Sequence, residues 1–197
     1  MASFLILYGT GEGQTATVAR RIGEKIAERG HETTVVDAAE TAHELEIEGF
    51  DAVLVGASIH AGKHQEPVTE FVRSMSEALA AKPTEFFQVS LSSATEEGRT
   101  QAAGYVDEFV ETTGWHPDRV GLFGGALRYS EYGFLKRLLM KQIAGRTIPD
   151  VPPADESGDV EFTDWHEVES FAADVAAFVE GRLGVAPPAS DPSERDS

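Results

Sequence analysis

Apolar and polar residues along this chain form blocks of two kinds that follow one another in turn. Short apolar or β-branched runs, which are typical of strands buried in a parallel sheet, occur at Ser3–Tyr8, Glu32–Val36, Ala52–Val55, Glu85–Leu91 and Val120–Phe123. Amphipathic stretches between and after these runs predict helices at Gln14–Arg29, Glu40–Ile47, Pro67–Leu79, Thr100–Thr112 and Asp164–Leu183, with Asp164 as the N-cap of the last. We therefore predict one α/β domain built on a parallel sheet, and we expect its ligand at the carboxyl ends of the strands.

A glycine-rich loop, YGTGEGQT at residues 8–15, directly follows the first predicted strand. It does not fit a nucleoside triphosphate, because Gln14 stands where such loops carry a lysine. A single monoester phosphate needs only main-chain N–H groups and hydroxyls at a helix N-terminus. The residues that offer them are Thr10, Gly11, Glu12, Gly13, Gln14 and Thr15. Two alternatives stay open: a turn that binds no ligand, and a dinucleotide site with Asp37 on a ribose, whose fingerprint begins at Gly9 and Gly11 but is broken at Gln14.

Five segments of the chain resemble the flavodoxin superfamily and, more narrowly, its menaquinone-dependent protoporphyrinogen oxidases. The segments are TGEGQT (10–15), GASIHAGKH (56–64), EFFQVSL (85–91), WHPDRVGLFGGALRYSEY (115–132) and FTDWHEV (162–168). The resemblance implies a flavodoxin-like three-layer sandwich with a five-stranded parallel sheet in the order 2-1-3-4-5. We place the domain at residues 1–184, with a basic helical insertion at about 128–150, and expect 185–197 to be a disordered acidic tail.

The same resemblance implies that FMN is the cofactor, with its phosphate on Thr10–Thr15 and its isoalloxazine ring between two loops. The residues of these loops are Ser58, Ile59 and His60 in one, and Ser90, Leu91, Ser92 and Ser93 in the other. The resemblance further implies an enzyme that oxidises protoporphyrinogen IX to protoporphyrin IX and passes the electrons to a membrane quinone. The alternative is a soluble flavodoxin-type electron carrier without porphyrin chemistry.

The chain departs from the family pattern in the residues that would stack on the flavin. Neither Trp nor Tyr occurs in residues 56–64 or 90–99, and Ala61 stands where relatives often carry an aromatic residue. The ring would thus be more exposed to an approaching substrate, or Tyr129 or Tyr132 would supply the missing stack.

No side chain is identified as the catalytic acid or base. Arg128 and His60 are the candidates for a role in catalysis. An arginine can pair bidentately with the propionate carboxylates of a porphyrinogen; the alternative for Arg128 is a surface arginine that balances acidic charge. His60 and His64 could accept a proton near the flavin, whereas solvated loop histidines without a role are the simpler interpretation. The six histidines show no spacing with carboxylates that indicates a metal site.

Composition narrows the function classes further. With 41% hydrophobic residues in 197, the chain can build a core, and the absence of cysteine excludes disulfides, thiolate metal sites and cysteine nucleophiles. No apolar run approaches the ~20 residues that cross a bilayer, and the N-terminus lacks a signal-peptide pattern, so we expect a cytoplasmic location. The 34 acidic and 16 basic residues give a net charge of −18. This charge opposes nucleic-acid binding and favours halophilic adaptation over an ordinary acidic mesophilic protein.

One segment departs from this charge balance. Residues 128–146 carry five basic side chains and one acidic, a net of +4. A helical projection of 131–146 separates an apolar face (Leu135, Leu138, Leu139, Ile143) from a basic face (Lys136, Arg137, Lys141). Such a helix can lie in the interface at the inner face of the cell membrane or guard the entry of substrate. The alternative is a helix that packs its leucines on the edge of the sheet.

Overall fold

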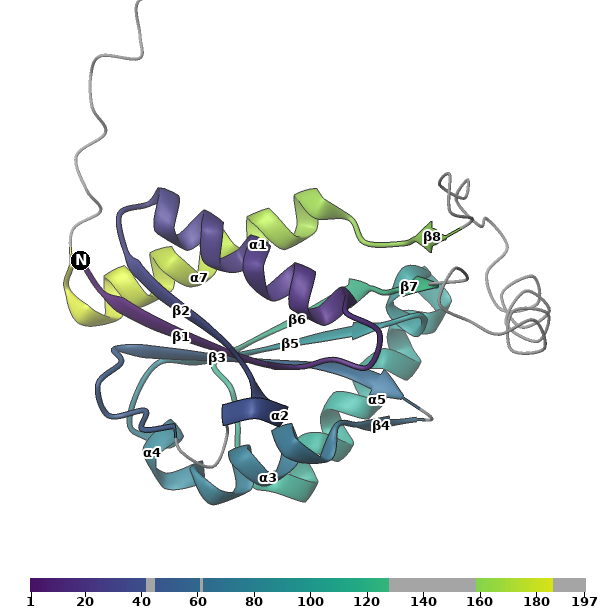
Figure 1. Ribbon diagram of the computed structural model, residues 1–197, viewed down its shortest axis with the longest axis horizontal. Coiled ribbons are helices and arrows are strands. Elements are labelled where there is room, and N and C mark those ends of the chain that lie inside the picture. The colour runs from purple at the N-terminus through teal and green to yellow at the C-terminus, as the bar shows by residue number, and fades with distance from the viewer. Residues whose placement is uncertain (42–44, 61, 128–158, 186–197) are drawn as a thin grey trace, which may run out of the picture.

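The computed structural model describes residues 1–41, 45–60, 62–127 and 159–185 (Figure 1). Its strands are β1 (Ser3–Gly9), β2 (Glu32–Asp37), β3 (Ala52–His60), β4 (Lys63–His64), β5 (Thr84–Ser90), β6 (Arg119–Gly124), β7 (Ala126–Leu127) and β8 (Val160–Glu161). Its helices are α1 (Gln14–Glu28), α2 (Ala38–Thr41), α3 (Glu66–Ser74), α4 (Ser76–Ala80), α5 (Glu96–Thr113) and α7 (Trp165–Leu183), with a short 3-10 helix, η1 (Ser92–Ala94). The basic helical insertion expected at 128–150 and the residues from 186 onward lie outside the described residues.

Five of the strands form a parallel sheet in the order β2-β1-β3-β5-β6. This is the predicted order 2-1-3-4-5, because β4 is a two-residue strand that pairs antiparallel with the end of β3 and lies off the main path. The register places Gly9 beside Ala57, Ser58 beside Val89, and Ser90 beside Gly124. The carboxyl ends of the strands therefore meet at one edge, and the strand order reverses there between β1 and β3.

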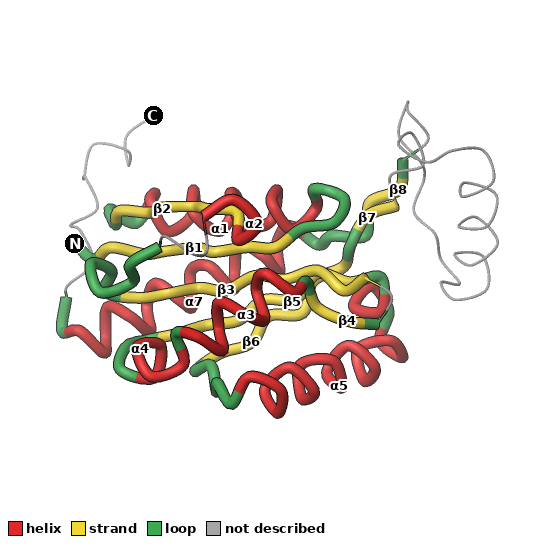
Figure 2. Tube along the Cα trace, turned by 60° about the horizontal axis from the view of Figure 1, so that its bottom comes forward, coloured by secondary structure: helices red, strands yellow, loops and turns green. Residues whose placement is uncertain are grey.

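The sheet is covered by helices on both faces, which is why its strands read as nearly continuous apolar runs. Figure 1 shows α1 and α7 over one face and α3, α4 and α5 over the other, and the turned view of Figure 2 keeps these layers apart. Phe87 and Phe123 lie in the core beneath α1 and α7, whereas Phe86 and Phe109 lie in the core on the side of α3 and α5. Neighbouring residues of a strand point to opposite faces, so Phe86 and Phe87 attach β5 to both layers.

The helix predicted over Pro67–Leu79 is interrupted. The structure divides it into α3 and α4, and Met75 between them has φ −105° and ψ 11°. Just before the break, the hydroxyl of Ser74 donates to the carbonyl oxygen of Phe71 at 2.9 Å. Serine is a poor residue for a helix interior because its side chain competes for such backbone groups, and this local competition accounts for the interruption.

The helix predicted over Glu40–Ile47 is wrong at its end, because α2 is described over Ala38–Thr41 and the chain at residues 45–47 is not helical. Ile47 is fully buried in the core on the side of α3. The ammonium group of Lys82 donates to the carbonyl oxygens of Ile47 and Phe50 at 2.6 and 2.8 Å, which satisfies backbone acceptors without a helix. Apolar residues of a loop that packs on the core were thus mistaken for the buried side of a helix.

Side-chain caps determine where the last two long helices begin. α5 begins four residues before the predicted Thr100, because Thr95 Oγ1 accepts the N–H of Gly98 at 3.0 Å. Asp164 caps α7, as predicted, and accepts from two backbone N–H groups of the first turn. Trp165 packs, partly buried, against the core beneath α1 and α7.

Candidate functional site

The candidate site lies at the carboxyl edge of the sheet, where the predicted segments meet. Gly9 ends β1, Ser58 lies near the end of β3, and Ser90 ends β5, on strands that are neighbours in the sheet. Figures 1 and 2 both place β4, β7 and β8 at this end of the molecule. The structure therefore brings together the three segments predicted to surround a ligand: Thr10–Thr15, Ser58–His60 and Ser90–Ser93.

Residues 10–15, which we call the 10–15 loop, connect β1 to α1 without a side-chain cap on the helix. Gly13 adopts φ 86°, a left-handed conformation that glycine adopts at no steric cost, and its N–H donates to Thr10 Oγ1 at 2.9 Å. The first turn of α1 contains no acidic residue. The positive end of a 15-residue helix is thus directed at the loop, an arrangement that favours a bound anion.

Thr15 provides a second, independent sign of an anion site. Its side chain is fully buried, and Oγ1 has no hydrogen-bond partner among the described residues. A buried hydroxyl without a partner costs about 1–3 kcal/mol, and a hydroxyl in the first turn of a helix is well placed to donate to an anion at that end. The surroundings of Thr15 therefore fit the predicted phosphate contact.

The side chain of Gln14 has a role that differs from the predicted main-chain contact. It is buried, and Nε2 donates to Glu161 Oε1 at 3.1 Å and to Thr163 Oγ1 at 2.8 Å. Thr163 Oγ1 in turn donates to the carbonyl oxygen of Gly124 at 2.8 Å. These bonds tie the 10–15 loop to β8 and to the end of β6. No sequence pattern indicates them, because Gln14 and its partners are 147 and 149 residues apart.

Ser58–His60 were predicted in a loop, but they are the last residues of β3 and continue into an antiparallel hairpin with β4. We call residues 58–64 the β3–β4 hairpin. The N–H of Ser58 donates to Gln65 Oε1 at 3.0 Å, and Gln65 Nε2 donates to the hydroxyl of Ser58. The N–H and the hydroxyl oxygen of Ser58 are therefore engaged by Gln65, so we expect a ligand at this strand end to contact mainly Ile59 and His60.

Gln65 is a site residue that sequence reasoning missed. It is the N-cap residue of α3, and its side chain also packs against the start of the 10–15 loop. A Cβ placed on Gly9 would lie 3.3 Å from that side chain and only 2.5 Å from Cγ2 of Val68. Glycine at this position is what lets α3 approach β1 so closely. The one available signal was the position of Gln65 just before the helix-starting Pro67.

The two histidines of the hairpin have different surroundings. His60 is exposed, whereas His64 is half-buried and its Nε2 lies 2.9 Å from Gln88 Oε1. Gln88 Nε2 donates to the carbonyl oxygen of Ala102 at 3.0 Å, so the amide oxygen faces His64 and the imidazole is the donor. Burial lowers the pKa of His64 to about 4, so this ring is neutral at pH 7. The interpretation as a solvated loop histidine is therefore wrong for His64, and His60 remains the candidate proton acceptor.

The serines at the end of β5 turn their hydroxyls toward the protein's own groups. Ser90 Oγ and Ser93 Oγ lie 2.8 Å apart, and the N–H of Ser93 donates to Ser90 Oγ at 3.1 Å. Ser92 Oγ donates to Gln101 Oε1 at 2.9 Å. A ligand between this segment and the β3–β4 hairpin would therefore contact main-chain groups at Leu91 and Ser92 rather than serine hydroxyls.

Two further interactions hold the segment after β5 in place. Arg99 NH2 lies 2.7 and 2.9 Å from the carboxylate oxygens of Glu167, which joins the first turn of α5 to that of α7. The N–H of Gly125 donates to the carbonyl oxygen of Ser90 at 3.1 Å. Neither Arg99 nor Glu167 was among the predicted site residues, and they meet because the first turns of α5 and α7, which cover opposite faces of the sheet (Figure 1), lie close together in the fold.

Some predicted features lie outside the described residues. They are the candidate Arg128, the tyrosines Tyr129 and Tyr132, and the basic segment 131–146. The described residues on either side, Leu127 and Val160, pair with each other in a small antiparallel sheet formed by β7 and β8. Within the described ranges, no helix is both long enough and apolar enough to cross a bilayer.

Comparison with known proteins identifies the family. A family model described as "Flavodoxin domain" matches residues 5–150, which is most of the chain. The chain belongs to this family. Protoporphyrinogen IX dehydrogenase (quinone) from Escherichia coli (strain K12) is 33% identical over 177 residues, covering 87% of this chain and 93% of that protein. A protein of the same name from Leishmania major is 31% identical over 178 residues, covering 88% of this chain and 74% of that protein.

A solved structure supports the same fold. A mutant flavodoxin from Pseudomonas aeruginosa matches with a TM-score of 0.55 at 18% identity, covering 91% of this chain and 99% of that one. The predicted resemblance and the flavodoxin-like fold are thus confirmed. Membership of the flavodoxin family indicates a flavin cofactor and oxidoreductase chemistry for this chain.

Proposed function

We propose that this chain is an FMN-dependent oxidoreductase that oxidises protoporphyrinogen IX to protoporphyrin IX and delivers the electrons to a quinone. The observation that carries the proposal is the match to a protoporphyrinogen IX dehydrogenase (quinone) over 93% of that protein's length. The match covers 87% of this chain, which is more than the residues that match the Flavodoxin domain alone. The flavodoxin from Pseudomonas aeruginosa covers 91% of this chain but is only 18% identical, against 33% for the dehydrogenase. The sequence identity, rather than the length covered, therefore favours the dehydrogenase.

FMN is the flavin that the described residues fit best. The 10–15 loop has no lysine, and it combines an uncapped helix N-terminus with the buried hydroxyl of Thr15. Such donors suit one terminal phosphate better than a chain of phosphates. Main-chain N–H groups of this loop and the Thr15 hydroxyl would hold the phosphate, and the isoalloxazine ring would lie between the β3–β4 hairpin and residues 90–93. When bound, FMN accepts electrons from a reduced substrate and passes them to an acceptor.

The residues around the ring would orient it mainly through the backbone. The hydroxyls of Ser58, Ser90 and Ser93 are already bonded within the protein, so main-chain groups on either side of the ring supply the contacts. His60 is exposed at the end of β3 and can take up a proton that leaves the substrate. Arg128, which lies outside the described residues, would pair with a propionate of the substrate.

A flavodoxin-type electron carrier without porphyrin chemistry is the second candidate. The observation that favours it is the structural match to a flavodoxin across 99% of that chain. A net charge of −18 also suits a carrier that docks with basic partners. The two candidates differ in one measurable property, because only the enzyme converts protoporphyrinogen into protoporphyrin.

Replacing Thr15 with valine tests the cofactor assignment. Valine keeps the branched shape and removes the hydroxyl, so Thr15→Val should raise the dissociation constant for FMN by about 10- to 150-fold, the worth of one hydrogen bond to a charged group. The apoprotein should keep or gain thermal stability, because the hydroxyl has no partner there among the described residues. Thr17→Ala is the control, since the hydrogen bond that Thr17 Oγ1 makes among the described residues is to the carbonyl oxygen of Gly13. Equal FMN affinity in the Thr15 variant, or FAD as the cofactor that copurifies, would contradict the assignment.

Anaerobic reduction of the purified flavoprotein tests the substrate. Addition of protoporphyrinogen IX should bleach the visible absorption of the flavin and produce protoporphyrin, and addition of a menaquinone analogue should restore the absorption. The Thr15→Val protein, prepared without flavin, is the control for spontaneous oxidation. A flavin that dithionite reduces but protoporphyrinogen does not would leave the electron carrier as the better assignment.

We also propose that residues 131–146 contact the membrane where the quinone resides. The support is the sequence alone, in which an apolar face and a basic face divide this segment. Changing Lys136, Arg137 and Lys141 together to Glu should leave FMN bound, since none of the three belongs to the 10–15 loop, and should reduce association with anionic liposomes. Unchanged sedimentation with liposomes and unchanged quinone-coupled turnover would contradict this proposal.

A further inference from the structure

The β3–β4 hairpin is the wall of the proposed flavin site that depends most on outside support. It is held to itself by two residue pairs, Ile59 with His64 and His60 with Lys63, and its second strand, β4, lies off the main path of the sheet. So short a pair of strands is not stable by itself. The contacts that join β4 to the rest of the domain therefore help to set the position of this hairpin.

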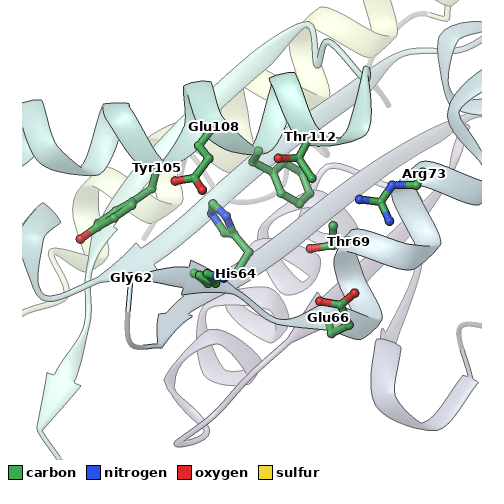
Figure 3. A pocket seen from close by; sticks show the side chains of 10 residues that line it. Gly62, His64, Glu66, Thr69, Arg73, Tyr105, Glu108 and Thr112 are labelled. Carbon is green, nitrogen blue, oxygen red and sulfur yellow. The ribbon is translucent and has the colours of Figure 1, made fainter.

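His64 provides this connection for β4, whereas the pairing of Ser58 with Val89 in the sheet holds the start of the hairpin. Figure 3 shows the ring of His64 directed from the hairpin toward α5, near Glu108. The ring centroid lies 4.7 Å from that of Phe109 on α5 and 5.5 Å from that of Phe86 on β5. Through Gln88, which is fully buried, the imidazole is also bonded to β5 and onward to the carbonyl oxygen of Ala102 in α5.

The hydrogen bond, rather than the aromatic packing, explains why this residue is a histidine. Phe86 and Phe109 stack on each other at 4.9 Å, and a phenylalanine at position 64 would fill the same space among them. Only a donor satisfies the amide oxygen of Gln88, which is buried beside it. A buried acceptor left without its partner is costly, so the bond gives the hairpin one preferred position instead of a range of them.

The other side of the imidazole borders a pocket of about 200 Å³ between α3 and α5. Its charged and titratable groups are those of Lys63, Glu66, Arg73, Tyr105 and Glu108. None of these has a hydrogen bond to His64 within the described part of the chain, so the contact to Gln88 is the directional one.

We propose that His64 is a positioning residue, whose hydrogen bond to Gln88 fixes the β3–β4 hairpin and thereby the wall against which the flavin ring lies. The inference rests on the proposed FMN site, and it assigns to His64 a role that needs no contact with flavin or substrate.

The variant His64→Phe tests the proposal, because it keeps an aromatic ring and removes the donor. We expect its dissociation constant for FMN to rise by about five- to tenfold, the worth of one hydrogen bond, with a changed midpoint potential and a changed visible circular dichroism of the bound flavin. His64→Gln, whose amide can donate to Gln88, should restore much of the affinity. Tyr105→Phe is the control, since it removes a hydroxyl from the same pocket without touching the bond to Gln88.

Hydrogen exchange of the apoprotein supplies a measurement that does not depend on flavin. Amides of residues 58–64 should exchange faster in His64→Phe, while those of β1 and β2 stay unchanged. A variant that only melts at lower temperature, with wild-type FMN affinity, potential and exchange in the hairpin, would overturn the inference and leave His64 a packing residue. Absence of FMN binding to the wild-type protein would instead overturn the proposed function, and this inference with it.

Discussion

Glu85 places a carboxyl group inside the sheet, at the end of β5 opposite the candidate site. Its side chain is fully buried, and neither carboxylate oxygen has a hydrogen-bond partner among the described residues. Alternation along the strand turns it to the same face as Phe87, beneath α1 and α7. Burial and then the negative charge of Asp118 raise the pKa of Glu85 to about 8, against the opposing effect of Arg119 and Arg182. In the folded protein Glu85 is therefore a neutral acid at pH 7.

This raised pKa makes the stability of the protein depend on pH in a defined window. The group ionises near 4.5 in the unfolded chain but keeps its proton up to about 8 in the folded one. Between these values the folded state binds more protons, so the free energy of unfolding falls as the pH rises. Each pKa unit corresponds to about 1.4 kcal/mol, so the stabilisation present below pH 4.5 and lost by pH 8 is at most about 5 kcal/mol.

Glu85→Gln isolates this effect, because glutamine has the same shape and does not ionise. Urea unfolding followed by circular dichroism, at constant salt from pH 4.5 to pH 9, should give similar free energies of unfolding at the acid end. At the alkaline end the variant should be more stable than the wild type by several kcal/mol, up to about 5. Glu32→Gln, at an exposed position on β2, should follow the wild-type profile. Parallel profiles for the wild type and Glu85→Gln would refute the reasoning.

Three further expectations follow from the charge and packing of the chain. The melting temperature should rise between 0.01 M and 1 M salt, because the Debye length falls from ~30 Å to ~3 Å and screens a net charge of −18; an unchanged melting temperature would contradict the halophilic interpretation. Arg99→Gln should lower the free energy of unfolding by no more than about 1 kcal/mol, since Arg99 and Glu167 are both 42% exposed, and a larger loss in urea would show that the pair is stronger than an exposed one. Gly9→Ala should destabilise the protein by about 1–3 kcal/mol, because its Cβ would lie 2.5 Å from Val68 Cγ2; wild-type stability would mean that α3 can move away.

The fold could be predicted because the sequence patterns that indicate its strands and helices are local and recur along the chain. β1 and β3 are apolar along almost their whole length, as strands covered on both faces must be. The 10–15 loop could be predicted equally well, because all its residues are contiguous and the glycine at position 13 indicates a left-handed turn. The prediction of a helix up to Ile47 failed for the reverse reason, since the carbonyl oxygens of Ile47 and Phe50 accept from Lys82, more than 30 residues away in the sequence.

The contacts within the site could be predicted less well than its position. A motif places Ser58 and Ser90 at the ends of their strands, but it does not determine which neighbour binds each hydroxyl. In the structure the hydroxyl of Ser58 is bonded to Gln65, and the hydroxyl of Ser90 is bonded to Ser93. Long-range partners such as Glu161, which binds Gln14 across 147 residues, leave no trace in a local pattern. Sequence reasoning therefore predicted the edge of the sheet at which a ligand is expected, but not the hydrogen bonds that the side chains make there.

The pairing of β7 with β8 has a consequence for how this domain can be altered. Ala126 pairs with Glu161 and Leu127 with Val160, so the described residues on either side of 128–158 are held side by side. Closing a flexible loop between two such ends costs only about 0.6 kcal/mol more for each doubling of the loop's length. Segments of very different length and chemistry can therefore be grafted between these two strands while the sheet and the 10–15 loop stay as they are. The β7–β8 pair is thus a place, beside the candidate site, where a segment can be replaced without redesigning the sheet.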